Sequence, residues 1–411
     1  MNTYIPTKIE EQKILAITCL SHFLSHFNLL VFPALVLPLS VHLGITLGRA
    51  IEISFWMYLM YGLTALPWGL AADRFGARAL LTLFHLGSAV SCFLAAVYVG
   101  SVNGLALSMM GLGIFSGIYH PAGLGLISKK MPRISRTLAV NGVFGSLGIA
   151  TAAVFAGFFN ACFGLRTVFI LLGMINLSGL FLLSGYRPNA KTKIKAATAN
   201  NTAAAGVLPF IILLCIMMLA GICYRGSTLT VPAYFELKNT GIFSWCASVS
   251  GLPLTENLVA TLSTTLILTA GIFGQLFGGR IAEKFDLRFC YIFMHMIIIP
   301  VVFLMARTAN LPLIALGMLY FFFLLGTQPI ENTLVARLTP EKFHSSAYGL
   351  KFIFTFGVGA LSVKAIKIIE TGFGIESVFL FLCLVSIVLV SVIGLLILVT
   401  SKRKASSPKS H

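Results

Sequence analysis

Charged residues are scarce in this sequence, and acidic ones are the scarcest. Only 10% of the 411 residues are Asp, Glu, Lys or Arg, and 12 acidic residues stand against 29 basic ones. A soluble domain carries about 25% charged residues. Hydrophobic residues make up 58% of the chain, and the mean hydropathy is +0.95. This composition excludes an ordinary soluble domain and predicts a protein that lives in a lipid bilayer.

Several motifs that would indicate catalysis are also missing. The sequence contains no GxxxxGK[ST] phosphate loop, so we predict no ATP site. The eight cysteines are scattered without a CxxC pair, and we interpret them as small hydrophobic residues rather than metal ligands. Neither a nucleophile–base pair nor a metal cluster is recognisable. The sequence therefore predicts a protein that is not an enzyme and that carries no metal or other cofactor.

Long apolar runs take up most of the chain. A membrane-spanning helix needs at least about 17 residues, and we find twelve apolar runs longer than that. They lie at roughly 13–39, 47–72, 78–99, 103–128, 137–161, 167–185, 208–235, 256–282, 288–306, 311–336, 344–369 and 375–400. We therefore predict an all-α integral membrane protein with twelve transmembrane helices. An even number of spans places both termini on one side.

The basic residues gather at the two termini and in every second loop. By the positive-inside rule these segments face the cytoplasm. The net charge of +17 thus reflects topology and attraction to anionic lipids rather than nucleic-acid binding. A basic, polar stretch separates two sets of six runs. We predict an N-terminal half at 1–185, a linker at 186–207, a C-terminal half at 208–400 and a basic cytoplasmic tail at 401–411.

One short motif occurs in both halves, after the second and after the eighth apolar run. At this point a helix must end, the chain leaves the bilayer, and a carboxylate sits among bases. Such an arrangement suits a salt-bridged latch between conformations. We call the two copies the first latch and the second latch. Their residues are Gly69, Asp73, Arg74, Gly76 and Arg78 in the first, and Gly279, Glu283, Lys284 and Arg288 in the second.

The two latches resemble the loop 2–3 and loop 8–9 signatures of the major facilitator superfamily. Three further pieces are similar to its fosmidomycin-resistance-type exporters of drugs and organic anions: Ser21-His22, Ile118-Tyr119-His120-Pro121, and Gly142, Gly145 and Gly148. The resemblance implies two pseudo-symmetric six-helix halves with a solute site between them, lined by helices 1, 4, 7 and 10. The sequence departs from the family's pattern at two positions. Ala122 occupies a position where the exporters have an acidic residue, and Asp286 occupies a position where the family's second-half signature has a glycine.

Few ionisable residues lie inside the apolar runs, where each costs at least about 2.5–3.5 kcal/mol on insertion scales. Glu331 is the predicted proton carrier, because a carboxyl in an apolar wall can load and unload protons. A structural salt bridge to Lys351 or Arg337 is the alternative. We predict that His26 and His120 relay protons, although a lone helix histidine is more often a packing residue.

Four residues are predicted to bind the solute, namely Arg225, Lys351, Gln328 and His22. Arg225 could hold an anionic group through its planar guanidinium, unless helix carbonyls or Glu331 already satisfy it. Lys351 could share that role, unless its side chain snorkels towards the membrane surface. A cavity with these cations and histidines against one acid would be basic, which favours an anionic solute.

Charges at the outer ends of two helices are interpreted as ordinary surface groups. Arg49 and Glu52 are three residues apart and are predicted to pair with each other. Lys364, Lys367 and Glu370 are predicted to form a solvated edge of another helix.

Together these features predict a secondary transporter of a bacterial inner membrane. We expect it to move a small organic solute, anionic or drug-like, by alternating access, coupled to protons and in the direction of export. Two alternatives stay open: import of a metabolite by proton symport, and a non-transporting receptor on a transporter fold. The expected partners are the solute, protons and membrane lipids, with no nucleic acid. The chain is expected to act as a monomer.

Overall fold

The computed structural model describes residues 7–186, 207–338 and 350–406, and within these ranges every regular element is a helix. Eleven helical stretches of the described residues are long and apolar enough to cross a membrane. The first consists of α1 (Lys8–Val31), a 3₁₀ turn η1 (Pro33–Leu35) and α2 (Val36–Leu43). The structure therefore confirms the all-α membrane fold.

The other ten stretches follow the predicted apolar runs to within a few residues. They are α6 (Ala77–Val97), α7 (Val102–Ser116) with α8 (Tyr119–Lys130), α9 (Ile134–Phe163), α10 (Leu165–Ser184), α11 (Val207–Lys238), α13 (Glu256–Lys284), α14 (Leu287–Met305), α15 (Asn310–Leu338), α18 (Glu376–Ser406), and a helix made of a π turn η3 (Ile353–Gly357), a 3₁₀ turn η4 (Val358–Ala360) and α17 (Leu361–Phe373). A short helix that the apolar runs did not predict, α12 (Thr240–Ser250), precedes α13.

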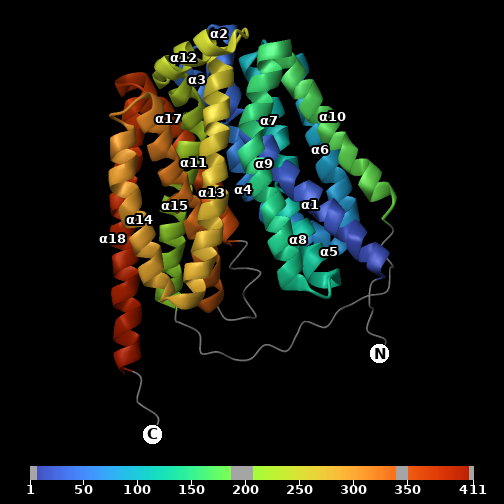
Figure 1. Cartoon of the computed structure of the whole chain (residues 1–411). Coiled ribbons are helices and arrows are strands. Elements are labelled where there is room, and N and C mark those ends of the chain that lie inside the picture. Colours follow the sequence, from blue (N-terminus) through green and yellow to red (C-terminus); the bar gives the residue numbers. More distant parts are fainter. Residues whose placement is uncertain (1–6, 187–206, 339–349, 407–411) are drawn as a thin grey trace.

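The second predicted run, 47–72, is not one continuous helix. It forms α3 (Leu47–Glu52), α4 (Phe55–Leu63) and α5 (Ala65–Phe75). Figure 1 shows α3 near the upper edge, α4 at mid-height and α5 near the lower edge, so the three pieces together span the bundle. Ser54 and Thr64 lie at the breaks, and their hydroxyls donate to backbone carbonyls three or four residues earlier. Such bonds compete with regular helix geometry.

Two groups of helices lie side by side in Figure 1. We call α1 to α10 the N-terminal group and α11 to α18 the C-terminal group. They meet where α9 packs against α13 and where α4 packs against η3 and η4. The start of α1 and the end of α18 lie at the same lower edge. The predicted domain boundaries remain predictions, because residues 187–206 and 407–411 lie outside the described ranges.

Glycine is required at two points of this architecture. Gly76 joins α5 to α6 with a φ of +85°, a backbone conformation that favours glycine. Gly62 lies in α4 against the C-terminal group, and a Cβ atom there would lie 2.2 Å from the backbone nitrogen of Gly357. The two groups therefore touch backbone to backbone, as close packing of membrane helices through small residues requires.

Candidate functional site

Glu331 lies in α15 with only 5% of its surface exposed, and it has two partners. The Tyr291 hydroxyl donates to Oε2 at 3.0 Å, and Nζ of Lys351 lies 2.7 Å from Oε1. Lys351 also donates to Oδ1 of Asn332. The Lys351 pairing matches the structural alternative considered for Glu331, whereas Arg337 is exposed. A buried pair of this kind leaves an uncompensated charge when one partner is lost.

Arg225 lies in α11 and is 2% exposed. Its guanidinium carbon stands 3.6 Å from the ring centroid of Tyr58 in α4, a cation–π contact that joins the two groups. The Nε atom of Arg225 is buried without a hydrogen-bond partner. No acidic side chain of the described residues lies within 4.0 Å of the guanidinium, and Glu331 is paired elsewhere. The interior thus holds a cation with no acidic counterion among these residues.

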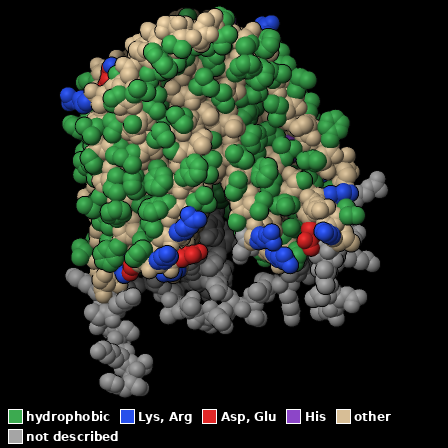
Figure 2. Space-filling view, in the orientation of Figure 1, with side chains coloured by type: hydrophobic (Ala, Val, Ile, Leu, Met, Phe, Trp, Pro, Cys, Tyr) green, Lys and Arg blue, Asp and Glu red, His purple; other side chains and the backbone are tan. Residues whose placement is uncertain are grey.

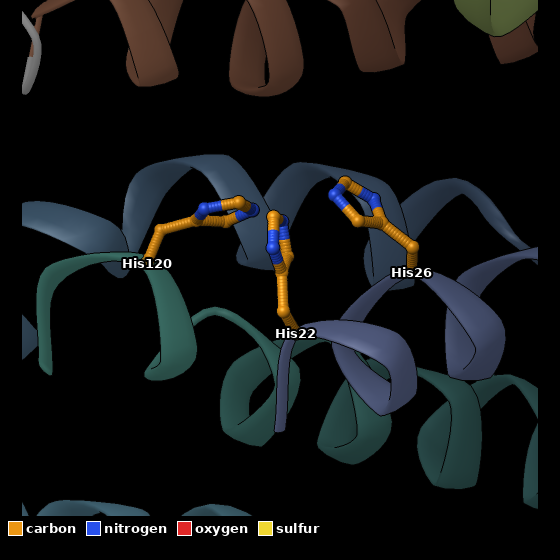
Figure 3. Close-up of side chains that lie close together, drawn as sticks. All are labelled: His22, His26 and His120. Atoms are coloured by element: carbon orange, nitrogen blue, oxygen red, sulfur yellow. The ribbon is translucent and has the colours of Figure 1, made fainter. Parts of the chain in front are cut away.

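Three histidines meet in the N-terminal group, where His22 and His26 of α1 approach His120 of α8. The ring centroids of His22 and His26 are 5.0 Å apart, and each lies 5.3 Å from that of His120. Figure 3 shows the rings of His120 and His26 pointing toward each other with the His22 ring between them. The sequence predicted separate roles for these residues and did not predict that they form one cluster.

The histidine cluster borders the C-terminal group. The His120 ring lies 4.7 Å from that of Phe352, the neighbour of Lys351 in the chain. Tyr61 of α4 also approaches His120, with ring centroids 6.1 Å apart, and Arg225 lies over Tyr58, one turn of α4 away. The predicted ionisable residues therefore gather at one boundary between the two groups.

Gln328 also lies at this boundary, in a chain of hydrogen bonds. Ser146 of α9 donates to Oε1 of Gln275 at 2.9 Å, and Nε2 of Gln275 donates to Oε1 of Gln328 at 3.1 Å. The bonds connect α9, α13 and α15. The predicted solute-binding role of Gln328 is untested, and its Oε1 atom already accepts a bond.

In the first latch, the acidic residue pairs with a lysine from outside the motif. Asp73 pairs with Lys129 at 2.6 Å, and both side chains are largely exposed. Arg78 donates to the backbone carbonyl of Leu183 at 3.4 Å, and Arg74 lies over the ring of Phe75. Asp73 was expected among its neighbouring bases, but the fold brings a lysine of α8 beside it. A Cβ atom added at Gly69 would lie 3.4 Å from Cβ of Pro121.

Asp286 lies within the segment of the second latch, at the position where the resemblance implies a glycine, and it binds the latch residue Arg288. Its side chain accepts a bond from the backbone N–H of Arg288, and Nη2 of Arg288 lies 2.6 Å from Oδ2. Arg288 also donates to Thr400 in α18. Glu283 and Lys284 are exposed at the end of α13, and Gly279 faces open space. Asp286 therefore caps α14, so the departure from the family pattern has a structural use.

At the opposite edge the predicted Arg49–Glu52 pair is present, but it is joined by charges that the sequence placed on a separate helix edge. Glu52 in α3 contacts Arg49 at 2.5 Å, but also Lys364 and, at 3.3 Å, Lys367 of α17. The Glu52 side chain is only 11% exposed. We call these four residues the Glu52 cluster. The predicted Arg49–Glu52 pair is confirmed. The prediction that Lys364 and Lys367 form a separate solvated edge was wrong, because the spacing within one helix cannot show that α3 packs beside α17.

The two edges of the molecule thus differ in shape. Figure 2 shows the molecule hollowed at the lower edge between the two groups, with Lys and Arg side chains on both sides. At the upper edge the Glu52 cluster joins the groups. In addition, α9 and α13 are joined by the bond from the Val154 N–H to Thr265 and by that from Asn160 to Asn257. Among the described residues the structure is closed at the upper edge and open at the lower one.

Two groups of membrane-crossing helices with buried charges at their boundary define a multi-pass membrane transport protein. Residues 18–255, more than half of the chain, match the model of the Major Facilitator Superfamily. The chain therefore belongs to the major facilitator superfamily, whose members carry small solutes.

Curated relatives support transport at low identity. The chain is 24% identical over 349 residues to the multi-drug resistance efflux pump PmrA of Streptococcus pneumoniae, covering 80% of this chain and 82% of the pump. It is 25% identical over 170 residues to the probable anion transporter 6, chloroplastic, of Arabidopsis thaliana, covering 41% and 33% of the two chains.

Solved transporter structures share the fold. A bacterial homolog of the human lysosomal transporter Spinster, in an inward-facing and unoccupied conformation, superposes with a TM-score of 0.70 at 14% identity and covers 96% of both chains. A POT family transporter in complex with 5-aminolevulinic acid gives a TM-score of 0.71 at 16% identity, covering 95% of this chain and 96% of the other.

Proposed function

We propose that this chain is a proton-coupled secondary transporter of a bacterial inner membrane that exports a small organic anion or anionic drug by alternating access. The resemblance to a multi-drug efflux pump supports export, and the partial resemblance to a probable anion transporter supports an anionic solute. The two predicted halves, 1–185 and 208–400, would move against each other within one monomer.

Arg225 is the observation that carries this proposal. It is a buried cation at the boundary of the two groups, and among the described residues it has an aromatic neighbour but no acidic counterion. Burying an unpaired charge in a membrane protein is costly, and such residues commonly mark a solute pathway. An anionic solute would supply the missing counterion through the planar guanidinium.

The proposed proton site is the Glu331–Lys351 pair. A proton added to Glu331 would remove the charge that holds Lys351, and Lys351 could then bind an anionic solute instead. Tyr291 would keep one carboxyl oxygen hydrogen-bonded in both states. Proton binding and solute binding would thus be coupled through one lysine.

The proposed orientation follows from the basic residues near the hollowed edge. Arg74, Arg78, Lys129 and Arg288 belong to segments at that edge, and the positive-inside rule places it in the cytoplasm together with both termini. The hollow would then open to the cytoplasm, where a solute to be exported enters.

Thermal unfolding of the purified protein with panels of organic anions, cations and neutral drugs tests the anion assignment. A ligand at 100 times its Kd stabilises the native state by about 2.7 kcal/mol. We expect stabilisation by anions that Arg225→Ala abolishes and that Arg307→Ala, a change at an exposed arginine, preserves. Stabilisation by cations or neutral drugs alone would contradict the anion site.

Transport of a stabilising anion into or out of proteoliposomes then tests coupling and direction. Glu331→Gln alone leaves Lys351 buried and unpaired, so the matched variant is Glu331→Gln with Lys351→Met. We expect this double variant to stay folded and to lose the response of transport to a proton gradient. A retained response would exclude Glu331 as the proton site. Uptake driven by inward proton flow would favour the importer, and no transport of any bound anion would favour the receptor.

A further inference from the structure

We propose that His22, His26 and His120 form a binding site for a divalent transition-metal ion such as Zn²⁺ or Co²⁺. One ring nitrogen from each histidine can be chosen so that all three lie within 4.8 Å of one another. Figure 3 shows that the three rings converge from two helices rather than stacking along one. The three-histidine site itself does not depend on the proton and solute roles proposed above for Glu331, Lys351 and Arg225.

The hydrogen bonds of the cluster leave the nitrogens needed for a metal. Nδ1 of His22 lies 2.8 Å from the backbone carbonyl oxygen of Asn141, which can only accept, so Nδ1 carries the hydrogen and Nε2 presents its lone pair. Metal-binding histidines commonly donate their other N–H to a carbonyl in this way. His120 is 9% exposed, and both of its ring nitrogens are buried without a hydrogen-bond partner. A metal ion would satisfy one of them.

The donor set selects the kind of metal. Neutral imidazole nitrogens suit zinc, nickel, copper and related ions, whereas magnesium and calcium prefer oxygen. Zinc–nitrogen bonds of about 2.0–2.1 Å in tetrahedral geometry place the ligand atoms about 3.3 Å apart. The nitrogens are now up to 4.8 Å apart, so the distance between two of them would have to shorten by about 1.5 Å when the metal binds. Both rings would contribute to that movement. Three protein ligands leave a fourth position open.

The neighbouring charges indicate what fills the fourth position. Arg225 lies over the ring of Tyr58, one turn of α4 from Tyr61, whose ring lies 6.1 Å from that of His120. A dication held by three neutral rings near this cation, which has no acidic counterion among the described residues, is repelled unless an anion joins it. We therefore assign the fourth position to an anionic group, and this part rests on the proposed anion transport. The solute class would then include anions that chelate transition metals.

Co²⁺ titration of the full-length protein, purified through a tag without histidine, tests the site by absorption spectroscopy. We expect one Co²⁺ per chain with the absorption of a four-coordinate ion, displaced by Zn²⁺. Loss of a hydrogen bond that supports a metal ligand weakens metal binding about 10- to 100-fold. His26→Gln and His120→Gln each remove a ligand itself, so each should weaken Co²⁺ binding by at least that factor. His42→Gln, at an exposed histidine of α2, should bind Co²⁺ like the wild type.

X-ray absorption of the Zn²⁺-loaded wild type keeps the proposal testable if the variants do not fold. Three imidazole ligands per zinc are expected. Fewer than three, binding without defined stoichiometry, or unchanged binding in both folded variants would overturn the site. Added thiocyanate should alter the Co²⁺ spectrum as it enters the fourth position. A spectrum that thiocyanate leaves unchanged would overturn the anionic fourth ligand, and this result is separate from any failure of anion transport.

Discussion

The two edges of this molecule use charge in opposite ways. At the upper edge one nearly buried carboxylate, Glu52, holds two lysines of the other helix group. At the lower edge Asp73 pairs with Lys129 and Asp286 pairs with Arg288, each within its own group. Among the described residues, ion pairs therefore connect the groups at the closed edge and leave them separate at the open edge.

This difference indicates which interactions set the free-energy difference between a form open at the lower edge and a form open at the upper edge. Exposed pairs such as Asp73–Lys129 contribute about 0–1 kcal/mol, so they hold the open edge only weakly. Glu52 is mostly removed from water and has three cationic partners, so its bonds are stronger. Opening the upper edge would break them, and latch contacts formed across the lower edge would have to compensate.

Gly62→Val should have the largest effect on the contact between the groups. A Cβ atom at this position meets the backbone of residue 357, which a side-chain rotation cannot relieve. We expect the transport rate to fall at least about tenfold. This corresponds to a destabilisation of roughly 1.4 kcal/mol of the form in which α4 packs against the C-terminal group. Proteoliposome transport measures this. Gly125→Val, which faces open space in α8, is the control, and equal activity of the two variants would contradict the packing role.

Glu52→Gln should shift the balance toward a form open at the upper edge. Loss of charge-assisted bonds worth about 1–3 kcal/mol predicts a shift of roughly 5- to 150-fold. Thiol labelling of a cysteine placed at Ala50, buried beside the Glu52 cluster, should become faster. Glu376→Gln is the matched control, because Glu376 pairs with Lys238 inside the C-terminal group. Identical labelling rates in both variants would show that the cluster does not hold this edge.

Asp286→Ala should lower stability without changing which edge is open. It removes the cap of α14, which costs about 0.5–2 kcal/mol, and frees Arg288 from its partner. Thermal unfolding should detect the loss, and Asp286→Asn should restore most of the cap. An alanine variant as stable as the wild type would contradict the capping role.

Asp73→Asn should have the smallest effect on stability and a visible effect on turnover. Its exposed pair with Lys129 contributes at most about 1 kcal/mol in this form. As a latch residue, Asp73 is expected to act when the lower edge closes, so transport should slow while solute binding stays unchanged. Unchanged transport at normal protein levels would exclude the latch role. Lys129→Ala removes the Asp73–Lys129 pair but keeps the Asp73 carboxylate, so it shows whether a slower turnover comes from loss of the pair or from loss of the latch residue.

The fold was predictable because each membrane crossing depends on a continuous run of apolar residues. Runs of apolar residues predicted the crossings, and the repeated glycine and acid–base pattern predicted two related halves. The broken helix at α3 to α5 was not predicted, since all of its residues are compatible with one apolar run and the breaks depend on bonds of Ser54 and Thr64.

The residues of the candidate site stand out in the sequence, but apart from the Glu331–Lys351 pair their partners do not. Arg225, Lys351 and Glu331 were recognisable because charge is rare in apolar runs. Asp73 meets a lysine 56 positions away, and Glu52 meets one 312 positions away. The histidine cluster was missed for the same reason, because His120 is far from α1 in the chain.

Alternating access is tested most directly by measuring both edges in the same protein. Spin labels at exposed Val41 and Leu252 report the upper edge, and labels at exposed Phe75 and Phe285, which occupy matching positions in the two latches, report the lower edge. With Glu52→Gln we predict that the upper distance lengthens while the lower distance shortens. If the upper edge opens and the lower edge stays as it is, the two edges are not coupled and the account is contradicted.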